Sequence, residues 1–93
     1  MSLPMKSELL IKIQKEGPCW DYDLVDSLLK EEGKTGDYWK FQFRFWLMEF
    51  LGVGLIKDVE YAPDDGSHFS EGNVLMKYEI TDLGLQRIHE MLE

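Results

Sequence analysis

Apolar residues recur at helical spacing in the first third of the chain and predict two helices. We expect the first over residues 5–15, because its apolar residues share one side and because Gly17 and Pro18 follow it. The second should begin at Asp21, whose carboxylate can cap the first turn, and end at Gly33. Its apolar positions are Tyr22, Leu24, Val25, Leu28 and Leu29.

A turn at residues 34–36 leads to a third segment, for which Asp37 is the expected cap and residue 51 the approximate end. From residue 39 to residue 45 this segment alternates apolar and polar positions, as a half-buried strand does. Beyond that point the alternation breaks and the apolar spacing becomes helical, which favours a helix for the whole segment. The positions that keep the helical spacing are Phe43, Leu47 and Phe50.

The last third of the chain predicts a hairpin and a final helix. Strands are expected over residues 55–61 and 74–80, joined by a loop of 12 residues rich in Pro, Asp, Gly and Ser. Thr81 or Asp82 caps the helix, whose expected apolar side is Leu83, Leu85, Ile88, Met91 and Leu92. The predicted fold is mostly α with a small antiparallel β-hairpin. Its order is that of a winged helix-turn-helix, with three helices, a β wing and a C-terminal helix.

Length and composition predict one domain over residues 5–93, because 93 residues can bury a single core without metal or disulfides. Residues 1–4 are interpreted as an expression-derived N-terminus. Cys19 is the single cysteine, so no intramolecular disulfide is expected. The chain shows neither a secretory signal nor an apolar run near the roughly 20 residues of a membrane span. We therefore expect a cytoplasmic protein that has no membrane partner.

Charge changes the picture of the partner. The chain has 18 acidic and 10 basic side chains, a net charge of −8. Such a charge repels a polyanion unless the few cations are gathered on one face. The net charge therefore disfavours a nucleic-acid partner if the basic side chains are spread over the surface of the fold.

Three stretches resemble the PadR-like and MarR-like winged-helix transcriptional regulators. In the first, over residues 10–24, Gly17 and Pro18 precede the step Asp21-Tyr22-Asp23-Leu24, where the PadR pattern has glycine in place of the aspartate at 21. The second joins the end of the third helix to the first wing strand and consists of Leu47, Phe50, Gly54, Leu55 and Ile56. The third, residues 77–84, is similar to the second wing strand and the following helix. The order and spacing of the three pieces carry the resemblance.

The resemblance implies a dimeric regulator, without enzyme activity or cofactor, that binds double-stranded DNA. It implies DNA contacts from the third helix and the wing, where the available polar and cationic side chains are Lys40, Gln42, Arg44, Lys57 and Lys77. Arg44 takes the place of a tyrosine in the family's recognition helix. The chain departs from the family at residues 39–43, which are large and mostly aromatic where the PadR pattern has small and hydroxyl residues.

The third helix carries more aromatic side chains than one buried stripe can use. Seven of the 12 aromatic residues of the chain lie between residues 38 and 50. The surplus either packs on the wing or the termini of the same domain, or it forms a protein interface. The second hypothesis is therefore a winged-helix interaction or dimerisation module that does not bind DNA, with a two-fold homodimer as the commonest solution. Its interface residues would be Tyr38, Phe41, Phe45 and Met48.

The remaining polar residues give weak signals for chemistry. Acidic residues and His68 in the 62–73 loop could hold a hard cation, but the calcium-loop pattern fails when its glycine is placed at Gly66. His89 is interpreted as a surface residue of the last helix. Cys19 has no base that the sequence identifies, and we expect it to be a small, partly buried residue. No metal site or catalytic site is predicted.

Overall fold

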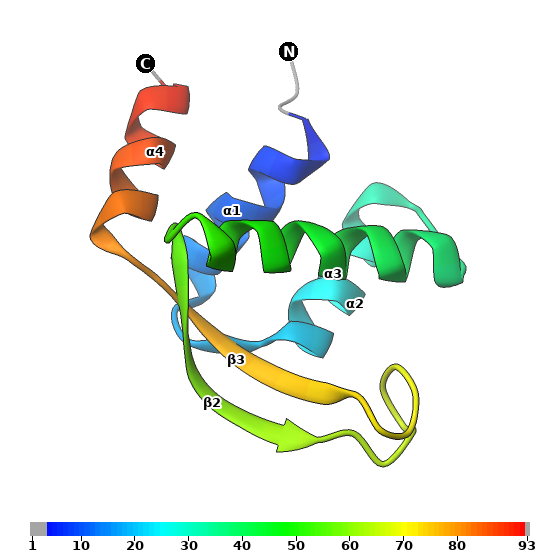
Figure 1. Ribbon diagram of the computed structural model, residues 1–93. Helices are drawn as coiled ribbons and strands as arrows, with labels where there is room; N and C mark the ends of the chain where they lie inside the picture. The colour runs from blue at the N-terminus through cyan, green and yellow to red at the C-terminus, as the bar shows by residue number, and fades with distance from the viewer. Residues whose placement is uncertain (1–3, 93) are drawn as a thin grey trace.

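Helices cover one side of a small antiparallel sheet in this protein (Figure 1). The computed structural model describes residues 4–92, and the predicted expression-derived end falls outside this range except for Pro4. The four helices and three strands are α1 (Met5–Glu16), β1 (Cys19–Trp20), α2 (Asp21–Glu32), α3 (Asp37–Gly52), β2 (Ile56–Pro63), β3 (Val74–Ile80) and α4 (Asp82–Leu92). The coarse prediction, mostly helix with a small antiparallel hairpin, is confirmed.

The third segment is a helix from its first turn, so the alternating pattern of residues 39–45 does not form a strand. Its buried stripe is the predicted one, because Phe43, Leu47 and Phe50 are at most 5% exposed. These side chains enter a single cluster with the apolar stripes of the first two helices and with the start of the hairpin. The members with the smallest exposure outside α3 are Leu9, Ile13, Leu24, Val25, Leu28 and Ile56.

Two of the three predicted helix caps are wrong. Asp21 is the first residue of α2, and its carboxylate accepts hydrogen bonds from the N–H of Tyr22 and, across the fold, from the N–H of Met76. Gly36 precedes α3, and Asp37 lies inside its first turn without a capping bond. Thr81 does cap α4, since its hydroxyl oxygen accepts from the N–H of Gly84.

The sheet has a strand that the sequence pattern did not predict. β1 is only two residues long, with Cys19 opposite Tyr78 and Trp20 opposite Lys77, so β3 lies between β1 and β2. A periodic pattern cannot appear in two residues, and the pairing joins positions far apart in the chain. The strand matters because it fixes the start of α2 against β3.

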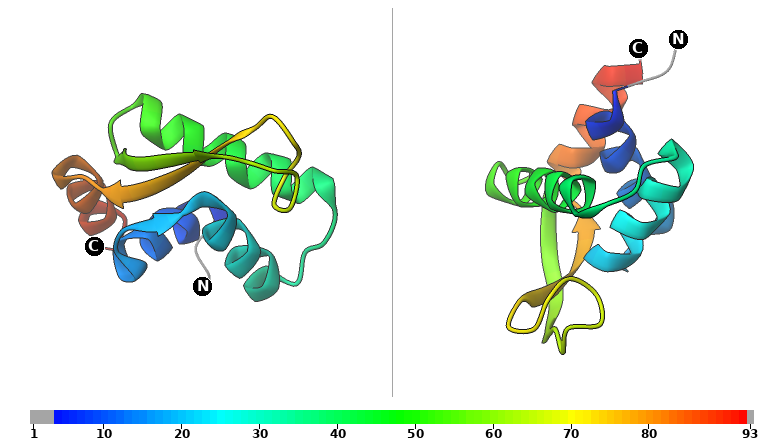
Figure 2. Two further views of the ribbon diagram at one scale, coloured as in Figure 1. Left: turned by 90° about the horizontal axis from the view of Figure 1, so that it is seen from below. Right: turned by 90° about the vertical axis from the view of Figure 1, so that its right-hand side faces the viewer.

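The hairpin is longer on its first strand than expected, since β2 ends at Pro63. A bulge between Asp58 and Glu60 bends that strand. The right-hand view of Figure 2 shows the hairpin projecting beyond the helices, with the loop of residues 64–73 at its far end. We call residues 64–73 the hairpin loop.

The expected apolar side of α4 is buried only in part. Ile88 is 6% exposed and Met91 packs at the edge of the core, but three leucines of the helix remain open to solvent. The exposed fractions are 46% for Leu83, 43% for Leu85 and 62% for Leu92. Among residues 4–92, none of the helices combines the length and apolar character that crossing a membrane requires.

Gly84 marks a place where α4 touches the hairpin backbone. A Cβ added there would lie 2.2 Å from the carbonyl oxygen of Leu55 and 2.6 Å from the side chain of Ile80. We predict that Gly84→Ala lowers the free energy of unfolding by about 2–3 kcal/mol, because the backbone oxygen cannot move aside cheaply. Urea denaturation measures the change. Gly52→Ala, also in a helix but with open space around its Cβ, is the matched control and should be neutral or slightly stabilising.

Candidate functional site

The outer face of α3 carries a row of exposed apolar side chains. Tyr38 is 68% exposed, Phe41 71%, Phe45 49% and Met48 64%. Their spacing of three, four and three residues aligns them along one side of the helix. We call this row the α3 stripe. It consists of the four residues that the sequence singled out as a possible interface, and neither the core nor the hairpin covers it.

The hairpin loop is folded by a buried carboxylate. Asp64 is 3% exposed, and its two oxygens accept hydrogen bonds from the backbone N–H groups of Gly66 (2.9 Å), His68 (3.4 Å), Phe69 (2.8 Å) and Ser70 (3.1 Å). Burial by itself would raise the pKa of this carboxyl, but the four N–H donors outweigh it and hold the pKa below the usual 3.8. Asp64 is therefore occupied by its own loop, where the sequence allowed a cation ligand.

Two side chains of the hairpin loop contact the helices. The ring of His68 stacks on Tyr22 of α2 with centroids 3.7 Å apart, and Tyr22 stacks in turn on Trp20. The ring of Phe69 lies 4.0 Å from the guanidinium carbon of Arg44 on α3. The loop therefore folds back on both helices. Sequence reasoning missed these roles of His68 and Phe69, which join residues more than 20 positions apart in the chain.

The structure places the candidate DNA-binding residues on two sides of the sheet. Lys40 and Arg44 line one hollow beside Phe69, on the side of the sheet where α3 lies. Lys57 and Lys77 alternate with the core residues of their strands and therefore point to the opposite side. Gln42 is half-buried on another side of α3 from Lys40 and Arg44.

Carboxylates accompany the cations of the strands. Lys57 is paired in register with Glu79, and Lys77 with Glu60. Directly opposite cross-strand partners lie on the same face of a sheet and partly cancel each other's charge. The strands therefore offer no continuous positive surface.

A second group of polar side chains meets between α3 and β3. Asp21 and Arg44 line a cavity of about 220 Å³ together with Tyr78 and apolar residues of both elements. Burial raises the pKa of Asp21 above 3.8, and it is opposed by the N–H groups of Met76 and Tyr22 and by the charge of Arg44. Burial also raises the pKa of Tyr78 to about 12, helped by the charge of Asp21.

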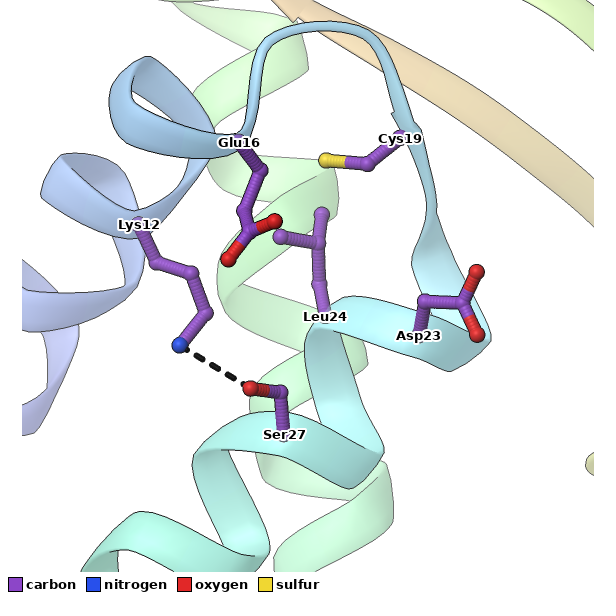
Figure 3. Close-up of a pocket in the computed structure, with 6 residues that line it drawn as sticks. All are labelled: Lys12, Glu16, Cys19, Asp23, Leu24 and Ser27. Carbon is purple, nitrogen blue, oxygen red and sulfur yellow. Dashed lines mark hydrogen bonds between the residues drawn. The ribbon is translucent and has the colours of Figure 1, made fainter.

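Cys19 lies in a different pocket, of about 260 Å³, between α1 and α2 (Figure 3). Its sulfur points toward Glu16, and Lys12 donates a hydrogen bond to Ser27 at 3.0 Å. Burial, together with the charges of Glu16 and Asp23, raises the pKa of the Cys19 thiol to about 11. A thiol with that pKa is a poor nucleophile at neutral pH. The geometry agrees with the expected role as a small, half-buried residue.

Comparison of the chain with protein-family models, with curated proteins and with solved structures gives no match.

The network around Asp64 predicts an acid-sensitive loop. Because the native pKa lies below the unfolded value, the carboxylate contributes its full stabilisation above about pH 4 and loses it as the pH falls through the native pKa. We expect the amides of Gly66, Phe69 and Ser70 to shift together as the pH falls below about 4. Two-dimensional NMR over a pH series measures this.

The loop prediction has a matched pair of variants. Asp64→Asn should speed hydrogen exchange at Phe69 and Ser70 at neutral pH, because an amide offers one acceptor oxygen where the carboxylate offers two. Asp65→Asn is the control, since Asp65 is exposed and bonds only to Ser67. Equal protection at Phe69 and Ser70 in both variants would show that Asp64 does not organise the loop.

Proposed function

We propose that the chain is a protein-interaction domain of winged-helix type that forms a two-fold dimer through the α3 stripe. The observation that carries the proposal is the row of Tyr38, Phe41, Phe45 and Met48, each about half exposed or more. Such a contiguous apolar row is costly to leave in water and is typical of a surface that another protein covers.

The order of elements supports the winged-helix part of the proposal. Three helices precede a hairpin, and a short strand between α1 and α2 adds to the sheet. In this arrangement α3 holds the place of a recognition helix and the hairpin that of a wing. The aromatic stripe therefore stands where a DNA reader of this shape would carry polar and cationic side chains.

The size of the α3 stripe favours a second copy as the partner. Four large side chains at these exposures present roughly 500 Å² of apolar surface, so two copies would bury about 1,000 Å², near the lower limit of a specific interface. Apolar residues spaced three and four apart form the seam of paired helices. Two copies of α3 can therefore pack along their stripes about a two-fold axis, and the same surface then contacts itself. In the antiparallel arrangement Phe41 would meet the second copy's Phe45, and Tyr38 its Met48.

The dimer is tested by charged substitutions in the stripe. Phe41→Glu or Phe45→Glu should raise the dimer dissociation constant by at least about 30-fold, because each buries a carboxylate in the centre of the interface. Analytical ultracentrifugation over a micromolar concentration series gives the constant, and circular dichroism confirms that the variants fold.

Tyr61→Glu is the matched control, because Tyr61 is 73% exposed but lies on β2. It should leave the dissociation constant unchanged. Leu85→Glu tests the other exposed apolar surface, on α4. A wild-type monomer would overturn the dimer, and loss of the dimer in Leu85→Glu alone would move the interface to α4.

DNA binding is the second candidate, and one observation favours it. Lys40 and Arg44 lie one turn apart on α3 and line the same hollow, so two of the five candidate contacts are gathered on the helix that a winged-helix regulator uses to read DNA. The resemblance to PadR-like and MarR-like regulators supports the same candidate.

DNA binding is tested with a random-sequence duplex at about 50 and 200 mM salt. A DNA-binding domain should lose affinity steeply between these concentrations, and Lys40→Ala combined with Arg44→Ala should abolish binding. Lys30→Ala removes an exposed cation from the end of α2 and serves as the control. A folded protein with no binding at the lower salt concentration would contradict this candidate and leave the dimer proposal intact.

A further inference from the structure

Arg44 is a guanidinium group held in place with its hydrogen-bond donors unused. The guanidinium carbon lies over the ring of Phe69, 4.0 Å from the ring centroid. Within the described part of the chain, Arg44 donates no hydrogen bond to another residue and makes no ion pair within 4.0 Å. A guanidinium has five N–H donors in a planar fork that fits a carboxylate. A stacked ring occupies a face of this fork and leaves donors at its edge.

Asp21 supplies a negative charge in the same cavity. It is 3% exposed, and each of its oxygens accepts one backbone hydrogen bond, from Tyr22 at 2.8 Å and from Met76 at 3.2 Å. Each carboxylate oxygen can accept a further bond. No cation lies within 4.0 Å of the Asp21 carboxylate in residues 4–92, and burial raises its pKa. A cationic group in the cavity would stabilise the charged carboxylate.

The rest of the cavity wall is mostly apolar, with the hydroxyl of Tyr78 and the amide of Asn73 as its polar groups. Leu47, Val74 and Met76 form the apolar part. The hydroxyl of Tyr78 donates to the sulfur of Met76 at 3.2 Å, and a thioether is a weak acceptor that a better one can replace. The volume of about 220 Å³ corresponds to roughly seven water molecules, which suits a small ligand rather than one of drug size.

We propose that the cavity between α3 and β3 binds a small zwitterion, an α-amino acid with an apolar side chain. Arg44 receives the carboxylate of the ligand, Asp21 receives its ammonium group, and the side chain packs on Leu47, Val74 and Met76. The opposite charges of the ligand match two opposite charges of the protein that line one cavity without pairing with each other. Met48 of the α3 stripe also lines this cavity, so the proposed dimer would border the site, but ligand binding does not require the dimer.

The test is a titration of the full chain with L-leucine up to about 10 mM, followed by the backbone amides in two-dimensional NMR. We expect saturable shifts at Val74 and Met76 and none at Lys12 and Glu16, which line the other pocket. Isocaproate, which lacks the ammonium group, and isoamylamine, which lacks the carboxylate, should each bind at least about tenfold more weakly. Absence of saturable shifts, or equal binding of isocaproate and leucine, would overturn the proposal.

Variants separate the site from general effects on the fold. Arg44→Gln should raise the dissociation constant of leucine at least about tenfold, because the bidentate contact is lost. Val74→Trp should block the cavity, and it is expected to fold because Val74 is 47% exposed. Lys40→Gln is the matched control, since Lys40 lies on the same helix and lines only the neighbouring hollow. An equal loss in Lys40→Gln and Arg44→Gln would show that net charge, not this cavity, governs binding.

Discussion

The attachment of the hairpin loop to the helices depends on the carboxylate of Asp64. Four backbone N–H groups converge on it, which gives the hairpin loop one compact conformation. That conformation places His68 on Tyr22 and Phe69 on Arg44, so the far end of the hairpin is attached to both α2 and α3. A buried carboxylate that accepts several N–H bonds is well stabilised.

The contact of the hairpin loop with α3 involves Arg44 and not the α3 stripe. α3 is the helix that would read DNA in a winged-helix regulator, and the loop leaves its apolar row open. Phe43, Leu47 and Phe50 are buried in the core and Arg44 contacts the loop, whereas the four side chains of the α3 stripe stay about half exposed or more. Within residues 4–92, the hairpin borders the stripe at Phe41 and Met48 without burying it. The four exposed side chains of the stripe are available to another molecule.

The same arginine also lines the cavity between α3 and β3. Arg44 contacts Phe69 and makes no ion pair with Asp21 within 4.0 Å, and both charged groups line one cavity. β1 contributes as well, because its pairing with β3 holds the start of α2, and with it Asp21, beside Met76. The loop, the short strand and the first turn of α2 together form this site from distant parts of the chain.

Local patterns in the sequence were sufficient for most of the secondary structure. Helical spacing and glycine stops placed all four helices, alternation with turn residues placed β3, and a hydroxyl before the last helix placed its cap at Thr81. These signals work because hydrogen bonding and burial within one helix or strand involve neighbours in the chain. The sequence alone also determined the net charge and the exposed row of α3, since both follow from which residues occur at which spacing.

Tertiary structure decided the features that join distant residues. Asp21 was expected to cap α2 and Asp64 was a possible cation ligand, but in the folded chain both carboxylates accept hydrogen bonds from backbone N–H groups of other segments or of the loop. Cys19 and Trp20 pair with β3. Tertiary structure also left the leucines of α4 exposed, because only one edge of that helix reaches the core. In each case the partner lies at a place in space that no local spacing encodes. The energy of a buried charge or a stacked ring depends on that partner, and this is why only the folded chain could decide these features.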